Sequence, residues 1–234
     1  MEKQLLATKK AETGTTQFAE EEIPLSYDNL ILPNRNLVKS IYVFNQKTTF
    51  DSTTKNSNIK LAQELLAQMS KDQFQSPYLK ETQIHSQNSI KMLIRFLQSN
   101  NDLSLLNQSY QEFLQCQAEW YRNIWLWDQS QTNSTNLLKR DVTLNWTEWT
   151  QANLHERNYI IATTLVQKQI HTFSQPEDIT VHVDAYQKSN SNSNITLDEL
   201  IHLFITSEAV QPRDFIKYKD QYVPVRMPQV AIYQ

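Results

Sequence analysis

The sequence of 234 residues contains a single glycine, Gly14, in a polar stretch near its start. An average chain of this length would carry roughly 16 glycines. Motifs that cradle phosphate, bind dinucleotides or present a catalytic serine on a sharp turn need glycines at fixed spacings. From residue 15 onward the sequence excludes such sites. Asparagine and glutamine together number 44, and we expect asparagine to fill turn positions because it tolerates left-handed backbone.

Cysteine and net charge are scarce too. The single cysteine, Cys116, cannot form an internal disulfide or a cysteine-rich zinc site, and it is expected to be a buried, inert thiol in a reducing compartment. The formal net charge of −3 provides no overall attraction to nucleic acid or to an anionic membrane. We therefore expect no direct contact with nucleic acid. No apolar stretch reaches the ~20 residues that cross a bilayer.

The N-terminal stretch lacks the apolar core of a secretory signal and contains three consecutive glutamates at 20–22. The sequence predicts a disordered leader over residues 1–22 and an intracellular protein, cytoplasmic or alternatively nuclear. Triplets of the N-glycosylation type begin at Asn107, Asn133, Asn145 and Asn194. Without an export signal they give no evidence of glycosylation.

Apolar residues recur at helical spacing through most of the chain. Shorter runs lie around residues 61–69 and 90–97, and the two longest cover about 102–127, with Asp102 as N-cap, and about 146–173. The loop between the long helices has under 20 residues, which favours antiparallel packing of one against the other. Thr196 and Glu199 form a capping-box pattern that begins a further helix.

Short β-type patterns occur at three places. The apolar run at 41–44 and the alternation at 179–184 predict single strands, and residues 215–226 predict a small C-terminal hairpin. The helical pattern dominates over these. The sequence thus predicts a mainly α fold, in which residues 23–234 form a single multi-helix domain with minor β structure at its edge.

Catalytic and metal-binding patterns are incomplete. His155 and Glu156 match the start of a zinc-hydrolase helix, but Tyr159 stands where the second histidine is required. His182 and Asp184 would share one face of a strand, yet no third ligand lies nearby in the sequence. We therefore predict no catalytic residue, no metal ligand and no cofactor, and a protein that is not an enzyme.

Aromatic residues crowd the end of the first long helix. At helical spacing Trp120 and Trp127 lie on one side and Trp125 on roughly the other, so we expect Trp120 to be buried and Trp125 to be partly exposed. An exposed tryptophan is typical of protein interfaces, which makes Trp125 and its neighbour Arg122 candidate protein-binding residues. Core packing, or a stacking platform for bases or cations, are the alternatives.

The segment from Trp146 onward resembles the middle homology region of fungal transcription factors with zinc-based DNA-binding domains. In that family, tryptophans three apart precede an acidic residue and two adjacent basic residues. Trp146, Trp149 and Arg157 match this signature, whereas Asn153 stands at the acidic position and Glu156 at the first basic one. The resemblance covers about residues 144–176. It adds the three matching residues to the candidate protein-binding set and implies at most the regulatory portion of such a factor.

Three functions follow from these patterns. The first is a non-catalytic interaction, adaptor or regulatory subunit that binds other proteins through an aromatic-bearing helical surface. The second is the regulatory portion of a fungal-type transcription factor. The third is an enzyme whose site assembles from residues distant in sequence, which would require a deep pocket with converging ionisable groups.

Overall fold

A computed structural model of the chain describes residues 22–131, 146–170, 172–189, 195–197, 199–201, 215–218 and 221–224. Helices make up most of these residues, which confirms the mainly α fold. In chain order the labelled helices are η1 (Tyr27–Ile31), α2 (Leu32–Lys47), α3 (Ser52–Met69), α4 (Pro77–Gln98), α5 (Leu103–Gln131), α6 (Trp146–Gln151), α7 (Leu154–Gln167) and α8 (Pro176–Ser189).

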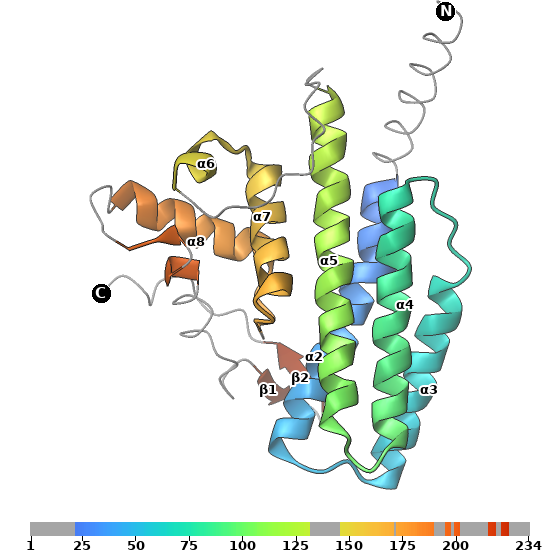
Figure 1. The fold of residues 1–234 in the computed structure, drawn as a ribbon. Helices are drawn as coiled ribbons and strands as arrows, with labels where there is room; N and C mark the ends of the chain where they lie inside the picture. The colour runs from blue at the N-terminus through green and yellow to red at the C-terminus, as the bar shows by residue number, and fades with distance from the viewer. Residues whose placement is uncertain are drawn as a thin grey trace, which may run out of the picture.

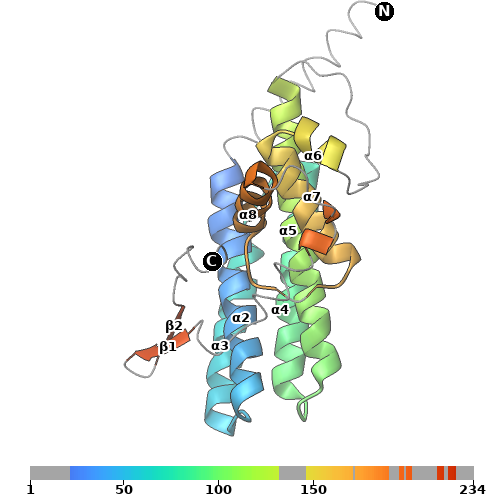
Figure 2. The ribbon, with the colours of Figure 1, turned by 90° about the vertical axis from the view of Figure 1, so that its left-hand side faces the viewer.

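The helices form two parts, which we call the bundle and the outer layer. The bundle comprises η1, α2, α3, α4 and α5, and the outer layer comprises α6, α7 and α8 (Figure 1). Helix α5 lies between them, with α4 packed on one side and α7 on the other. Helix α5 carries apolar residues on two opposite faces, and each face is covered by a neighbouring helix. The outer layer lies to one side of α5 in Figure 1 and therefore in front of the bundle in Figure 2.

Helix α2 contains the run at 41–44 that the sequence predicts as a strand, so that prediction is wrong. Leu37, Val38 and Ile41 are all buried, at a spacing that only a helix brings to one face. A run of four β-type residues is too short to override this period. The π-turn η1 precedes the helix, and Pro33, in the first turn of α2, lacks the N–H that would bond back to that turn.

Helices α3, α4 and α5 begin at recognisable signals. Asp51 accepts a hydrogen bond from the Thr54 backbone at 2.6 Å, and Asp102 accepts one from Ser104 at 3.0 Å, so both carboxylates act as N-caps. Pro77 occupies the first turn of α4. In the turn before α5, Asn101 has a φ of 64°, the left-handed conformation expected of an asparagine that replaces glycine.

The second long helix predicted over 146–173 is broken in two. Asn153 adopts an extended backbone between α6 and α7, and its side chain accepts a hydrogen bond from the Glu156 backbone at 2.9 Å. Asparagine is among the best N-cap residues, and here capping prevails over continuing the helix. The antiparallel pairing with α5 is confirmed. Trp125, near the end of α5, stacks on Tyr159 near the start of α7.

Helix α7 ends in a Schellman motif. The backbone N–H of Gln169 donates to the Val166 carbonyl at 3.1 Å, and that of Ile170 donates to the Leu165 carbonyl at 3.0 Å. Glycine usually takes the left-handed position of this motif, but here Gln169 does so with a φ of 51°. A side chain with a Cβ pays a steric cost for this conformation.

The strand predicted at 179–184 is also wrong, because these residues lie in α8. Ile179 and Val183, four positions apart, are buried, whereas Val181 between them is exposed. Strand alternation would have placed all three on one face. Pro176 begins this helix with Glu177 and the following aspartate in its first turn, an arrangement typical of helix N-termini.

Near the C-terminus the capping box is confirmed. Thr196 Oγ1 accepts from the Glu199 backbone at 3.2 Å, and the Glu199 carboxylate accepts from the Thr196 backbone at 2.8 Å. Farther on, strands β1 (Phe215–Tyr218) and β2 (Gln221–Pro224) pair antiparallel. The place of this β structure at the edge of the helical domain stays a prediction. Residues 1–21 of the predicted leader lie outside the described residues, and Glu22, its last residue, is the first described one and is helical.

The bundle is joined along one seam by polar side chains. Asn34 Nδ2 donates to Ser86 Oγ at 3.1 Å, and Asn34 Oδ1 lies 3.0 Å from the Ser89 hydroxyl. The Ser109 hydroxyl of α5 donates to the Ser89 carbonyl of α4 at 2.8 Å. All four residues are buried. Together they tie α2, α4 and α5 to one register, because a shift of either neighbour would leave buried groups unpaired.

Candidate functional site

The structure buries Trp125, contrary to the expectation of a partly exposed residue. Its side chain is 6% exposed, and its ring stacks on that of Tyr159 with centroids 5.3 Å apart and planes at 10°. The sequence pattern placed Trp125 opposite Trp120 correctly, but that opposite face is covered by α7. Trp120 is buried in the bundle as expected, and its Nε1 donates to Ser26 Oγ at 3.0 Å.

Two further candidates from the sequence lie at separate places. Arg122 is partly exposed on α5, with its guanidinium 4.9 Å from the centre of the Tyr78 ring and 3.5 Å from the Glu119 carboxylate. Trp146 is partly buried in α6, and its Nε1 donates to the Ile195 carbonyl at 3.0 Å. The structure therefore does not bring these two together with Trp125 on one surface. A binding role for them stays a prediction.

Trp149 and Arg157 do meet, on Asp184. Arg157 Nη1 lies 3.0 Å from both carboxylate oxygens of Asp184, and Trp149 Nε1 donates to one of them at 2.8 Å. Arg157 Nε also donates to the Trp149 carbonyl at 2.9 Å, which satisfies the end of α6. This contact fastens α6, α7 and α8 together. The Asp184 carboxylate is thus bound by Arg157 and Trp149. Asp184 and His182 lie in a helix, so they do not share one face of a strand as the sequence pattern suggested.

A second cluster, which the sequence analysis did not identify, lies where the outer layer meets the bundle. The non-helical link between α7 and α8, together with the first turn of α8, rests on side chains from η1, α2 and α5. We call residues 172–177 the strap. We call the side chains that hold it the tyrosine face, which consists of Tyr27, Arg35, Lys39, Tyr42, Tyr110 and Tyr121.

Helical spacing brings the tyrosine face together. Arg35, Lys39 and Tyr42 follow one another at intervals of four and three residues along α2, so they share one side of it. Tyr110 and Tyr121 are separated by three turns of α5 and also share a side. The two stripes face the same strap, and Figure 2 shows α8 in front of this part of the bundle.

Phe173 is the apolar anchor of the strap. Its ring meets Tyr110 edge-on, with centroids 5.3 Å apart, and Tyr42 likewise at 5.6 Å. The amino group of Lys39 lies 5.8 Å from the centre of the same ring. Phe173 is 6% exposed. Edge-on aromatic contacts of this kind contribute beyond the apolar area that they bury.

Backbone groups of the strap are held by side chains of the bundle. The Tyr110 hydroxyl donates to the Thr172 carbonyl and accepts from the Thr172 N–H at 2.7 Å. Arg35 donates to the Phe173 carbonyl. The bundle therefore satisfies backbone groups of Thr172 and Phe173, which lie in the part of the strap that precedes α8 and is not helical.

The far end of the strap is held through its side chains. Tyr27 donates to Gln175 Oε1 at 3.0 Å, and Tyr121 donates to the Glu177 carboxylate. Two cations of the tyrosine face, Arg35 and Lys39, contact the strap at Phe173, and the beginning of α8 contributes two carboxylates, on Glu177 and Asp178. The two sides are therefore complementary in charge.

The phenols of the tyrosine face are protonated donors over the ordinary pH range. Burial raises the pKa of Tyr110, and burial together with the neighbouring Glu177 carboxylate raises that of Tyr121. Burial likewise raises the pKa of Tyr27 and Tyr42. The hydrogen bonds that Tyr27, Tyr110 and Tyr121 donate to the strap are therefore retained until strongly alkaline pH.

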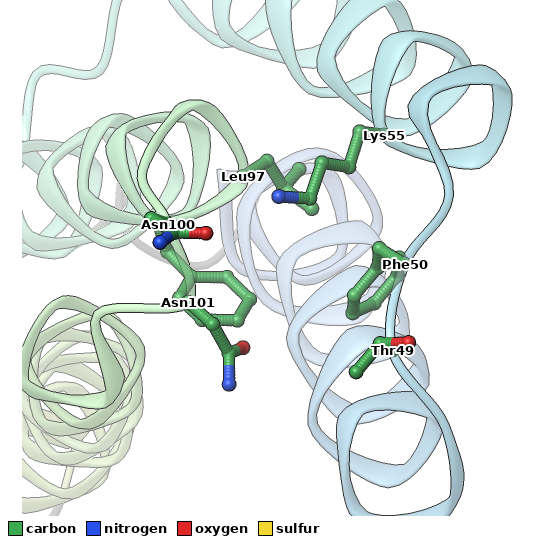
Figure 3. Close-up of a pocket in the computed structure, with 7 residues that line it drawn as sticks. Thr49, Phe50, Lys55, Leu97, Asn100 and Asn101 are labelled. Carbon is green, nitrogen blue, oxygen red and sulfur yellow. The ribbon is translucent and has the colours of Figure 1, made fainter.

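A shallow hollow lies at the other end of the bundle, between the α2–α3 connection and the end of α4 (Figure 3). Its volume is about 120 Å³, and Lys55 is the one ionisable side chain among its lining residues. The Lys55 amino group donates to the Ser99 carbonyl at 3.2 Å. The hollow is smaller than the ~300 Å³ at which ligand pockets begin. It does not provide the converging ionisable groups that an enzyme site requires.

Cys116 is fully buried between α4 and α5, as predicted, and burial raises the pKa of its thiol. Within the described ranges no group of three or more histidine, cysteine, aspartate or glutamate side chains is arranged to hold a metal ion. No helix in that part of the chain is long and apolar enough to cross a membrane. Comparison with known proteins gave no match to a family model, a curated protein or a solved structure.

The sequence contained a partial signal for the tyrosine face. Tyr110 belongs to the apolar stripe of the first long helix, and Pro176 marks the start of a new element after a polar break. A stripe with tyrosine in place of leucine has hydroxyls that must find partners when buried. The identity of those partners depends on the link between α7 and α8, which no local pattern specifies.

Proposed function

We propose that this chain is a non-catalytic interaction or regulatory subunit, and that the tyrosine face is the surface that recognises other proteins. The observation that supports it is the way the bundle holds the strap. An aromatic anchor, two contacts to backbone and a contact to a carboxylate make up a mode of recognition suited to a protein segment. We place the protein inside the cell, in the cytoplasm or the nucleus.

The five residues proposed from the sequence then take a supporting part. Trp149 and Arg157 fasten the outer layer, and Trp125 packs it on α5. Loss of any of these would change binding through the position of the strap. Arg122 and Trp146 are partly accessible and are the two that would still contact a partner directly.

The regulatory portion of a fungal-type transcription factor is the second proposal. Its support is that Trp149 and Arg157, two of the three residues that match the family signature, contact each other. The pairing gives a physical reason for the spacing of those residues. This proposal predicts nuclear residence, or a neighbouring gene that encodes a zinc cluster.

Tagged full-length chain, purified from its native cells and analysed by mass spectrometry, tests the main proposal. We expect a protein that co-purifies in a fixed ratio and that forms a binary complex with the purified chain in analytical ultracentrifugation. Purified chain that remains alone at every concentration, yet converts a substrate, would contradict the proposal and favour the enzyme alternative.

A further inference from the structure

We propose that the tyrosine face is a peptide-recognition site that this chain closes with its own strap, and that a partner protein opens it by inserting a segment of the same chemistry. That segment carries an aromatic residue followed, four positions later, by aspartate or glutamate. The inference rests on the proposed function, and it adds the chemistry of the partner and the means of regulation.

The contacts of the strap define what a replacement must carry. Phe173 is enclosed by the Tyr42 and Tyr110 rings, so the replacement needs an aromatic side chain at that position. Tyr121 donates to the Glu177 carboxylate, so an acidic residue is needed four positions later. The contacts to the Thr172 and Phe173 backbones are open to any sequence, because they use only carbonyl and N–H groups.

Charge favours an acidic segment over a neutral one. Arg35 and Lys39 lie on the tyrosine face, and both contact Phe173 of the strap. Asp178, next to Glu177, adds a second negative charge on the side of the chain's own segment. A partner segment with acidic residues after its aromatic anchor reproduces this pairing.

The closed state has features that favour release. Three residues before the strap begins, Gln169 holds a backbone in the left-handed conformation, which a residue with a Cβ adopts at a steric cost. The layer released with the strap contains buried polar atoms that have no hydrogen-bond partner, among them Asn158 Oδ1 and Thr180 Oγ1. Opening would let both atoms bind water. The left-handed residue and the unpaired oxygens destabilise the state in which the strap covers the tyrosine face, whereas the contacts between strap and tyrosine face stabilise it.

The strap and the partner segment compete for the tyrosine face, and this competition determines how tightly the partner binds. A tethered segment acts at an effective concentration on the order of mM. A free segment of equal intrinsic affinity therefore binds the closed chain weakly, and its apparent affinity rises as the fraction of open chain rises. Loss of the strap anchor should release the site without altering the face that binds the partner.

Fluorescence anisotropy with a synthetic peptide of the sequence of residues 170–179 tests this directly. Full-length Phe173→Ala should bind the peptide at least about tenfold more tightly than the unaltered chain. Phe50→Ala, the same change in a partly buried phenylalanine at the far end of the bundle, should bind it no better than the unaltered chain. A peptide with alanine in place of its phenylalanine should bind none of the three.

Equal affinity of the unaltered chain and Phe173→Ala would overturn the inference, as would equal binding of the alanine peptide. Phe173→Leu, which retains an apolar side chain, replaces the alanine variant if that variant loses its helical circular dichroism. Loss of helical signal in both would also overturn the inference, because Phe173 would then belong to the indispensable core.

The capture experiment separates this inference from the function on which it rests. If peptide binds the opened variant but neither form of the chain captures a protein from native cells, the inference stands and the proposed function fails. If one partner is captured equally by the unaltered chain and by Phe173→Ala, the proposed function stands and the inference fails.

Discussion

Helix α5 meets α4 through polar groups that have hydrogen-bond partners, whereas its contact with α7 contains a buried polar atom that has none. Toward α4, the buried hydroxyls of Ser89 and Ser109 both have partners, and Asn34 of α2 joins them. Toward α7, Trp125 Nε1 is buried without one, and so is Asn158 Oδ1 within α7 itself. An unpaired buried group costs about 1–3 kcal/mol. The difference indicates that the bundle is the more stable part and that the outer layer is docked onto it.

The pairing toward α4 has one gap. Asn123 accepts a hydrogen bond from Ser76 at 2.6 Å through its Oδ1, while its Nδ2 is buried and unpaired. This residue lies on the half of α5 that is far from the serine contacts. The gap reduces the difference in hydrogen bonding between the two sides of α5 without removing it, because the four polar residues that join α2, α4 and α5 all have hydrogen-bond partners.

Two tryptophan-to-alanine substitutions should lower the free energy of unfolding most, and the two should differ in how much of the molecule unfolds. Trp120→Ala and Trp149→Ala each remove a buried indole, which costs about 3–5 kcal/mol. Trp120 lies in the bundle, so its loss should unfold the whole chain. Trp149 lies in the outer layer, so its loss should release α6, α7 and α8 while the bundle keeps its helices. Circular dichroism with alkylation of Cys116 as a reporter distinguishes the two.

The lone thiol makes this test specific, because Cys116 lies inside the bundle. We expect fast alkylation in Trp120→Ala and continued protection in Trp149→Ala. Equally fast alkylation in both variants would mean that the chain unfolds as one unit, and the distinction between bundle and outer layer would be lost.

Alkaline pH should weaken the tyrosine face next. Below the unfolded phenol pKa of 10.0 both states are protonated and stability is complete. Above it the unfolded chain loses protons that the buried Tyr110 and Tyr121 retain, so the free energy of unfolding falls as pH rises. The loss is on the order of 1 kcal/mol per pH unit for each phenol. Urea unfolding on either side of that pH measures it.

The matched control is the double variant Tyr110→Phe with Tyr121→Phe. It lacks both titrating hydroxyls, so it should be less stable at neutral pH and should lose less stability as the solution becomes alkaline. A slope as steep as that of the unaltered chain would show that these phenols are not the groups responsible.

Exchange of one buried asparagine for leucine should have opposite consequences on the two sides of α5. Asn34→Leu removes partners from Ser86 and Ser89 and should cost about 1–3 kcal/mol. Asn158→Leu replaces an oxygen that has no partner and should be neutral or slightly stabilising. Thermal unfolding of the two variants measures the difference. A stabilised Asn34→Leu, or a strongly destabilised Asn158→Leu, would contradict the comparison.

The sequence predicted what depends on local periodicity. Some features follow from neighbours within a few residues: the apolar stripe of α5, the capping box at Thr196, and the N-caps at Asp51 and Asp102. All of these except the cap at Asp51 were identified from the sequence. The break at Asn153 carried a local signal too. It was missed because the apolar pattern continues on both sides of the cap.

The remaining features depend on long-range packing. Whether Trp125 is exposed depends on what covers the second face of α5, and the residues that do so begin about 30 positions later. The strands expected at 41–44 and 179–184 are helical because the surrounding residues impose a helical period on short β-type runs. The buried position of Tyr110 could be foreseen, but the tyrosine face as a whole could not, since the partners of its side chains lie on the strap.

Hydrogen exchange of the native chain, followed by mass spectrometry in low concentrations of denaturant, tests the docked outer layer most directly. We predict that amides of α7 and α8 exchange through an opening of lower free energy than amides of α4 and α5. Phe173→Ala should lower the first value and leave the second unchanged. A single free energy for all four helices, shifted equally by that substitution, would contradict the account.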